Sequence, residues 1–179
     1  EGVIPDHPLA VAATNWKKKP DFKQLRWEDA LEMFEEKSDL CVTPKFNGAL
    51  FAIHYKEGGG HKVDGTLLTT ERSIVSRSSG AAVLKTPVTT IMASKGGAIL
   101  WENHITREFE DACVKKGVSE ALFIGELFEH DAFGVVRGPQ AITATVMRKE
   151  IDPRAFKRLR YALVDIVTLN GQDVDVEYR

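Results

Sequence analysis

The strand-like segments of this chain come in neighbouring pairs, and this pairing constrains the fold more than any other feature. Residues 40–46 and 49–55 are rich in β-branched and aromatic side chains, and Asn47-Gly48 between them is typical of a tight turn. Four more strand-like segments follow at 73–77, 98–101, 122–128 and 160–169. Helical segments separate some of these strands but do not alternate with each of them. The pattern therefore predicts an α+β fold with antiparallel sheets and flanking helices.

The first helical segment spans residues 27–36 and is short and amphipathic. Trp27, Leu31 and Phe34 recur at helical spacing, so we expect them to face the core. Residues 1–25, which precede this helix, contain three prolines and no clear periodicity. We therefore expect them to form an irregular arm of a single domain that spans residues 1–179.

Three further helices are predicted from residues that are typical of helix ends. Thr106 can cap a helix that runs to Lys116, and Gly117 is typical of the residue that ends it. Residues 141–149 form the next predicted helix. A short basic helix then opens at Asp152-Pro153, with Asp as the N-cap and Pro in the first turn.

The composition is that of an ordinary soluble globular protein. Hydrophobic residues make up 43% and charged residues 28% of the 179 residues. No apolar run approaches the roughly 18 residues that cross a bilayer, and the first residues do not resemble a secretory signal. Cys41 and Cys113 lie far apart in the sequence, so we expect both to be reduced core residues. The expectation is an intracellular monomer, cytoplasmic or nuclear, without a membrane partner.

Basic residues concentrate in one part of the chain, although the net charge is −2. Residues 137–160 carry seven basic and two acidic side chains, and such an excess can attract a phosphate backbone. A solvated helix face is the alternative interpretation of the same pattern. The candidate nucleic-acid-binding residues are Arg148, Lys149, Arg154, Lys157 and Arg158.

The segment Thr43-Pro-Lys-Phe-Asn-Gly48 places Lys45 at the end of a predicted strand and directly before a tight turn. A lysine side chain in water is almost entirely protonated at neutral pH, so a nucleophilic lysine has to be held rigidly and partly removed from water. The glycine that follows allows the backbone to approach a phosphate closely. Taken alone, the same residues also fit an ordinary hairpin turn.

Three later segments carry polar residues at strand positions. Ser76-Arg77-Ser-Ser-Gly80 ends a strand in a loop of small residues, where Arg77 can hold a phosphate or a ribose hydroxyl. Gly125-Glu126-Leu127 places a carboxylate within an apolar strand. This carboxylate needs a partner, such as a ribose hydroxyl or a metal-bound water. Residues 161–166 form another strand with one carboxylate, Asp165.

In this order the four segments resemble the covalent nucleotidyltransferase superfamily, which comprises DNA ligases, RNA ligases and mRNA capping enzymes. Lys45-Phe-Asn-Gly48 resembles the lysine motif K-x-D-G, and residues 76–80 resemble the arginine-glycine motif that follows it. Gly125-Glu126-Leu127 resembles the G-E-L strand, and residues 161–166 resemble the Y/F-x-x-F-D-I strand. The resemblance covers about residues 40–175 and implies a ligase-type adenylation domain.

The resemblance implies an ATP-dependent polynucleotide ligase that seals nicked DNA, as in DNA repair, with RNA as the second choice of substrate. The Lys45 amine would attack the α-phosphate of ATP and hold AMP as a phosphoramidate. The AMP would pass to a 5′-phosphate, and a 3′-hydroxyl would then displace it. Mg²⁺ would neutralise charge on the phosphates.

The resemblance also implies the roles of individual residues. Asp165 would either support the metal or hold its strand in place. Phe46 competes with Tyr161 as the aromatic residue that packs on adenine. The implied nucleotide-binding residues are Lys45, Asn47, Gly48, Arg77, Glu126 and Tyr161, and the implied metal ligands are Glu126 and Asp165.

The sequence departs from the superfamily pattern at several positions. Asn47 replaces the usual Asp and removes a negative charge beside the lysine. Leu50 stands where DNA ligases and capping enzymes usually have Arg, which favours RNA ligases, whereas residues 163–173 resemble the strand and turn of DNA ligases. The later motifs, with a second metal-binding Glu and a pair of lysines, do not follow Asp165. We therefore expect the adenylation domain to be incomplete at its C-terminal end.

Three alternatives stay open. A non-catalytic nucleotidyltransferase-like module that binds nucleic acid or a partner is favoured by Asn47 and by the missing motifs. An mRNA capping guanylyltransferase would form its adduct with GTP, and Leu50 counts against it. In a plain α+β domain the motif matches would be coincidental, and Lys45, Arg77 and Glu126 would not meet in one cleft.

Overall fold

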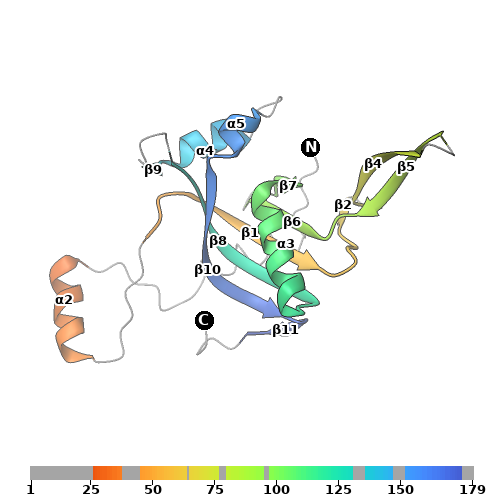
Figure 1. Ribbon diagram of the computed structural model, residues 1–179. Helices are drawn as coiled ribbons and strands as arrows, with labels where there is room; N and C mark the ends of the chain where they lie inside the picture. Colours follow the sequence, from red (N-terminus) through yellow and green to blue (C-terminus); the bar gives the residue numbers. More distant parts are fainter. Residues whose placement is uncertain are drawn as a thin grey trace.

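The computed structural model in Figure 1 gives the arrangement of most of the chain. It describes residues 26–37, 45–63, 65–76, 80–94, 97–130, 136–146 and 152–174. The arm expected at residues 1–25 and Cys41 lie outside these ranges. Within them, no helix is long and apolar enough to cross a membrane.

A seven-stranded antiparallel sheet forms the body of the described chain. Six of its strands follow the order β11-β10-β8-β1-β6-β7, and β9 pairs with the end of β8. The long strand β8 therefore lies between β10 and β1. The predicted α+β fold with antiparallel sheets is confirmed. The strands are β1 (Ala49–Lys56), β6 (Thr90–Ser94), β7 (Ile99–Trp101), β8 (Glu120–His130), β9 (Val136–Arg137), β10 (Leu159–Leu169) and β11 (Gln172–Asp173).

Three helices pack along the sheet: α3 (His104–Lys116), α4 (Pro139–Val146) and α5 (Pro153–Phe156). Thr106 is not the N-cap of α3, because Asn103 takes this position and Thr106 completes a capping box with it. Gly117 ends α3 in the left-handed conformation, with φ of 66°. Asp152 caps α5 as predicted, and its side chain accepts a hydrogen bond from the backbone N–H of Arg154.

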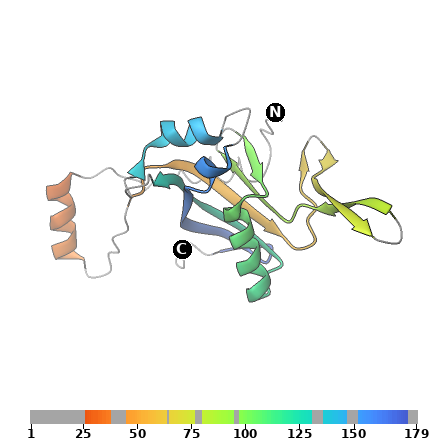
Figure 2. The same ribbon diagram turned by 45° about the horizontal axis from the view of Figure 1, so that its top comes forward.

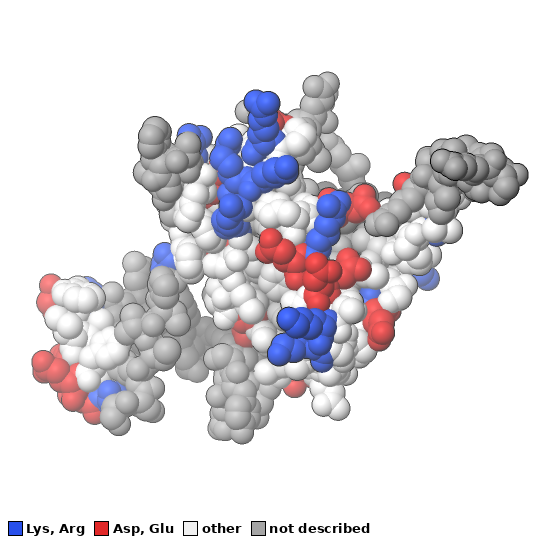
Figure 3. Space-filling view, viewed as in Figure 1, with Lys and Arg blue, Asp and Glu red and all other residues white. Residues whose placement is uncertain are grey.

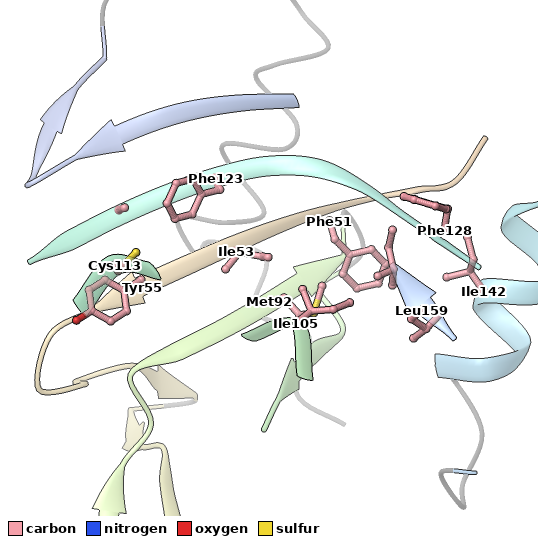
Figure 4. Packing of buried hydrophobic residues seen from close by; sticks show 12 residues of the cluster. Phe51, Ile53, Tyr55, Met92, Ile105, Cys113, Phe123, Phe128, Ile142 and Leu159 are labelled. Atoms are coloured by element: carbon pink, nitrogen blue, oxygen red, sulfur yellow. The ribbon is translucent and has the colours of Figure 1, made fainter. Parts of the chain in front are cut away.

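Apolar side chains are buried on both faces of the sheet. The helix face carries Phe51 and Ile53, which form one core cluster with residues of α3 and α4 (Figure 4). The opposite face carries Ala52 and Ile124, which belong to a second cluster. Residues of β1 alternate between the two clusters because successive side chains of a strand point to opposite faces. Cys113 is free and buried in the cluster of the helix face, as expected of a reduced core cysteine.

Two separate hairpins follow the far end of β1. In the first, β2 (Lys62–Val63) pairs with β3 (Thr66–Leu67). In the second, β4 (Thr69–Ser76) pairs with β5 (Gly80–Pro87), so the strand predicted at 73–77 is the second half of a longer strand. Both views show the β4–β5 hairpin extending away from the sheet on the side opposite to the start of β1 (Figures 1 and 2).

The helix α2 (Trp27–Glu36) forms where the sequence predicts it, but its apolar stripe is not part of the core. Trp27 is 72% exposed, Leu31 46% and Phe34 43%. Both views show α2 standing apart from the sheet (Figures 1 and 2). The expectation that these three residues face the core is therefore wrong. Helical spacing shows that one side of a helix is apolar, but it does not show which surface covers that side.

Candidate active site

Lys45 belongs to a short segment, residues 45–48, that leads into β1 and is called the lysine segment below. The strand predicted at 40–46 does not extend into it, because residues 45–47 have no regular structure and Gly48 is a bend. Phe46 turns inward and stacks on Phe128, with ring centroids 5.0 Å apart. Lys45 and Asn47, on either side of Phe46, are exposed. Phe46 thus anchors the segment, while Lys45 lacks the partial removal from water that an activated nucleophile needs.

Gly48 brings the lysine segment directly against β8. A Cβ atom at this position would overlap the carbonyl oxygen of Leu127 and would lie 3.2 Å from Oε2 of Glu126. Only glycine allows two backbones to approach each other so closely. The lysine segment and the strand that carries Glu126, which are far apart in the sequence, therefore meet at this point.

Glu126 and Asp165 project from the same face of the sheet. Residues that lie directly opposite each other on neighbouring antiparallel strands share a face. Glu126 lies opposite Leu50 on β1 and opposite Ala162 on β10. Asp165 lies opposite Ile124, two residues away along β8, after a shift of register in β10. The two carboxylates are therefore diagonal neighbours on the face opposite the helices.

This pair of carboxylates has the chemistry of a magnesium site that also uses substrate oxygens. Mg²⁺ prefers oxygen ligands and is commonly held by one or two carboxylates together with water and phosphates. In the part of the chain that the structure describes, no group of three or more His, Cys, Asp or Glu side chains could hold a metal ion.

Tyr161, which we expected to pack on adenine, projects from the other face. It lies opposite Leu127 in the register of β10 and β8, so its ring is on the helix face. Its hydroxyl donates a hydrogen bond to the carbonyl of Phe51 over 2.9 Å, and Phe109 of α3 packs against its ring at a centroid distance of 5.4 Å. The structure therefore does not bring the ring of Tyr161 to the face of Glu126.

The side chain of Asn47 lies near Gly138, the residue before α4. A Cβ atom at Gly138 would lie 3.6 Å from Nδ2 of Asn47 and 3.7 Å from Oε1 of Gln140. Gly138 directly precedes Pro139, the first residue of α4. The side chain of Asn47 therefore lies beside a helix start, where anions are favoured.

Basic side chains gather over α5 and the start of β10, at the end of the sheet where the lysine segment lies (Figure 3). Arg154 and Lys157 are exposed. Arg158 is partly exposed, and its Nε donates a hydrogen bond to Oε1 of Glu129 over 2.8 Å. Arg154 and Lys157 are therefore available to a ligand, whereas Arg158 also holds the buried carboxylate of Glu129. Arg148 and Lys149 lie outside the described residues.

Glu129 is an important residue that sequence reasoning missed. It is 1% exposed and accepts hydrogen bonds from Arg158 and, over 3.3 Å, from the hydroxyl of Thr145 in α4. It therefore fixes α4 and the residues after α5 to the end of β8, next to Phe128. One sequence signal could have identified it. Glu129 is a second carboxylate next to the apolar residues of the predicted strand at 122–128, three residues after Glu126.

Arg77 lies outside the described residues, but residues close to it on both sides are placed. Ser76 pairs with Gly80 at the end of the β4–β5 hairpin that is remote from the sheet. The start of β1 lies on the opposite side of the molecule (Figure 2). The expected convergence of Arg77 with Lys45 and Glu126 concerns a residue outside the described ranges and stays a prediction.

A pocket of about 180 Å³ lies at the far end of β1, between the base of the β4–β5 hairpin and the start of α3. One of its residues, Thr90, lies opposite Tyr55, whereas the lysine segment precedes Ala49 at the other end of the strand. The pocket is therefore separate from the candidate active site. Its lining residues are Thr70, Thr86, Pro87, Val88, Thr89, Thr90, Glu102, Thr106, Arg107 and Glu110.

The sequence matches no known protein family, and no curated protein was found to be similar to it.

Proposed function

We propose that this chain contains the adenylation site of an ATP-dependent polynucleotide ligase, with DNA as the favoured substrate and Lys45 as the AMP acceptor. The observation that carries the proposal is the contact at Gly48. It joins the lysine segment to Glu126 and Leu127, so that two of the four motifs meet in space. Asp165, from a third motif, projects from the same face as Glu126.

The chemistry assigned to this site is the transfer of AMP. Lys45 Nζ, after losing a proton to solvent, forms a P–N bond with the α-phosphate of ATP. The P–O bond to the β-phosphate breaks, and pyrophosphate leaves with the electron pair. A 5′-phosphate oxygen of the nucleic acid then attacks the same phosphorus, and the P–N bond breaks. Finally, a 3′-hydroxyl attacks the 5′-phosphorus and releases AMP, which seals the strand.

The described residues have distinct parts in this scheme. Phe46 holds the lysine segment on the core through its contact with Phe128. The Glu126 carboxylate is an acceptor for a ribose hydroxyl. Glu126 and Asp165 would hold Mg²⁺, which when bound neutralises negative charge on the phosphates.

The position of the basic residues supports a nucleic-acid substrate. Arg154 and Lys157 are exposed at the end of the sheet that carries the lysine segment. Exposed Lys and Arg side chains bind phosphates and release counterions, which gives most of the affinity for a nucleic-acid backbone. A strand that binds there would pass close to Lys45.

A non-catalytic nucleotidyltransferase-like module is the second candidate, and two observations favour it. Lys45 is exposed to water, and Asn47 stands beside it where the superfamily usually has Asp. Such a module would bind nucleic acid through the same basic residues without forming a covalent adduct.

The first experiment is incubation with ATP labelled at the α-phosphate, followed by denaturing electrophoresis. We expect a covalent adduct that disappears in Lys45→Ala and persists in Lys56→Ala, a matched exposed lysine at the other end of β1. Label from GTP but not from ATP would select the capping guanylyltransferase. Label from neither nucleotide, together with retained binding to a nicked duplex, would select the non-catalytic module.

A second experiment decides the substrate. Nicked duplexes that differ only in whether the sealed strand is DNA or RNA are offered to the protein with ATP and Mg²⁺. We expect sealing of the DNA nick at the higher rate. If the protein seals only the RNA nick, it is an RNA ligase and not a DNA ligase.

A further inference from the structure

The side chain of Tyr161 reaches across three strands of the sheet. From β10 its ring lies over Gly125 of β8, where a Cβ atom would be only 2.7 Å from Cζ of the tyrosine. Its hydroxyl then donates to the carbonyl of Phe51 on β1 over 2.9 Å. Gly125 is the residue before Glu126, and Phe51 lies three residues after Gly48. Tyr161 therefore connects the two strands that carry the lysine segment and Glu126.

The surroundings of Tyr161 leave little of its ring for a nucleotide base. Gly125 of β8 lies against the ring, and Phe109 of α3 packs edge-on against it at an interplanar angle of 86°. Burial raises the pKa of Tyr161, and the charge of Glu126 raises it further. The hydroxyl therefore stays protonated and keeps donating to Phe51 at any pH at which a ligase would work.

We propose that Tyr161 is a positioning residue, which holds β1 against β8 from the helix face and so fixes the lysine segment relative to Glu126 on the opposite face. This inference rests on the proposed adenylation by Lys45, and it replaces the expected role of Tyr161 in stacking on adenine. Group transfer is sensitive to such positioning, because small displacements of a reacting group lower the rate steeply.

The Tyr161→Phe variant removes the hydrogen bond and keeps the ring over Gly125. We expect its rate constant for adduct formation to fall by about tenfold, while the ATP concentration for half-maximal rate and the final fraction of labelled protein stay unchanged. Loss of folding would instead lower the labelled fraction. The matched control is Tyr55→Phe, a buried tyrosine on a central strand but at the far end of β1. We expect this control to leave the rate unchanged.

Two kinetic outcomes would overturn the inference. A rise in the ATP concentration for half-maximal rate, with an unchanged rate constant, would mean that Tyr161 contacts the nucleotide after all. Equal rates in Tyr161→Phe and wild type would mean that its hydrogen bond does not position the lysine segment.

Amide hydrogen exchange tests the same inference without any activity. In Tyr161→Phe we expect the amides of residues 49–53 and 125–127 to exchange roughly fivefold faster, which corresponds to the loss of one hydrogen bond. The amides of β6 report global stability and should change less. An equal change in β6, or no change at all, overturns the inference. If wild type forms no adduct but the selective change is seen, the proposed ligase activity fails and the positioning by Tyr161 stands.

Discussion

Two glycines, one just before β1 and one within β8, allow contacts that a side chain would prevent. At Gly48 a Cβ atom would overlap the Leu127 carbonyl oxygen, and at Gly125 it would overlap the Ala162 carbonyl oxygen. Neither residue needs glycine for an unusual φ angle, since neither is among the residues with positive φ. Their role is therefore close approach, at Gly48 for the lysine segment and at Gly125 for the ring of Tyr161.

The first prediction at this scale concerns Gly48→Ala. The added methyl group would push the lysine segment away from β8, so we expect a loss of about 1–3 kcal/mol in the free energy of unfolding, as for other overpacked sites. Urea denaturation measures this loss. The matched control is Gly138→Ala, where the nearest atom, Asn47 Nδ2, would be at an ordinary 3.6 Å, and the change should stay within about 0.5 kcal/mol. Equal effects of the two variants would show that the contact at Gly48 is not tight.

The second prediction concerns the pH dependence of stability at His54. Burial lowers the pKa of His54 below its ordinary value of 6.5, although its hydrogen bond with Glu120 acts in the opposite direction. The unfolded chain therefore takes up a proton at a higher pH than the folded chain. As the pH falls below about 6.5, this group favours unfolding, and the loss levels off once the pH is below the folded pKa.

The measurement is the free energy of unfolding of wild type and His54→Gln, by urea denaturation between pH 7.5 and pH 5. We expect the stability of wild type relative to the variant to decrease as the pH falls. Groups that do not contact His54 titrate equally in both proteins and cancel in the difference. A difference that is constant, or that grows on acidification, would contradict the lowered pKa.

Among the elements, the end of β8 contacts several other parts of the chain through the side chains of Glu129 and Phe128. Glu129 accepts hydrogen bonds from Thr145 in α4 and from Arg158 just after α5. Phe128 stacks on Phe46 of the lysine segment. The end of β8 thus contacts α4, the residues after α5 and the lysine segment. A substitution at Glu129 should therefore destabilise this end of the sheet.

The third prediction is that Glu129→Gln lowers the free energy of unfolding by about 2–4 kcal/mol, because it removes the charge of a buried ion pair and leaves Arg158 without its carboxylate. The expected loss is smaller than for a fully buried ion pair, because the Arg158 side chain is 43% exposed. The matched control is Glu71→Gln, whose partner Lys85 is in an exposed ion pair and whose loss should cost at most about 0.5 kcal/mol. If both variants lose the same small amount, the buried pair is not a structural link.

The helices and the long strands β1, β8 and β10 were predictable from local patterns, whereas β5 and β6 were not predicted. Residues 27–36 formed the predicted helix, and Asn170-Gly171 forms the predicted turn, with positive φ at both residues. Periodicity and turn residues are local signals, so they identify elements well. The N-cap of α3 was misplaced by three residues because Asn103 and Thr106 both belong to one capping box.

The candidate site was only partly predictable, because strand register and hairpin direction depend on the whole molecule. The sequence order suggested that Lys45 and Glu126 belong together, and Gly48 lies directly against the strand that carries Glu126. The face from which Tyr161 projects depends on the pairing of β10 with β8, which no local pattern specifies. The exposure of the apolar stripe of α2 depends in the same way on long-range packing.

Across the molecule, charge is distributed unevenly, and this distribution gives the last prediction. Figure 3 shows basic side chains over α5 at the end of the sheet that carries the lysine segment, and a mixture of acidic and basic side chains along α3. Arg154 and Lys157 belong to the first region, whereas Lys115 and Lys116 lie at the end of α3. If nucleic acid binds beside Lys45, only the first pair contacts its phosphates.

The test compares the binding of a nicked duplex at several salt concentrations in Arg154→Ala/Lys157→Ala and in Lys115→Ala/Lys116→Ala. Each lost phosphate contact should reduce the slope of log K against log salt by about 0.9, so we expect the first double variant to lose up to about 2 in slope. Its affinity should fall similarly for all sequences, because phosphate contacts carry no base information. The second double variant has the same change in net charge and should keep the slope of wild type. An equal loss of slope in both double variants would mean that net charge alone attracts the duplex. The proposal that nucleic acid binds beside Lys45 would then fail.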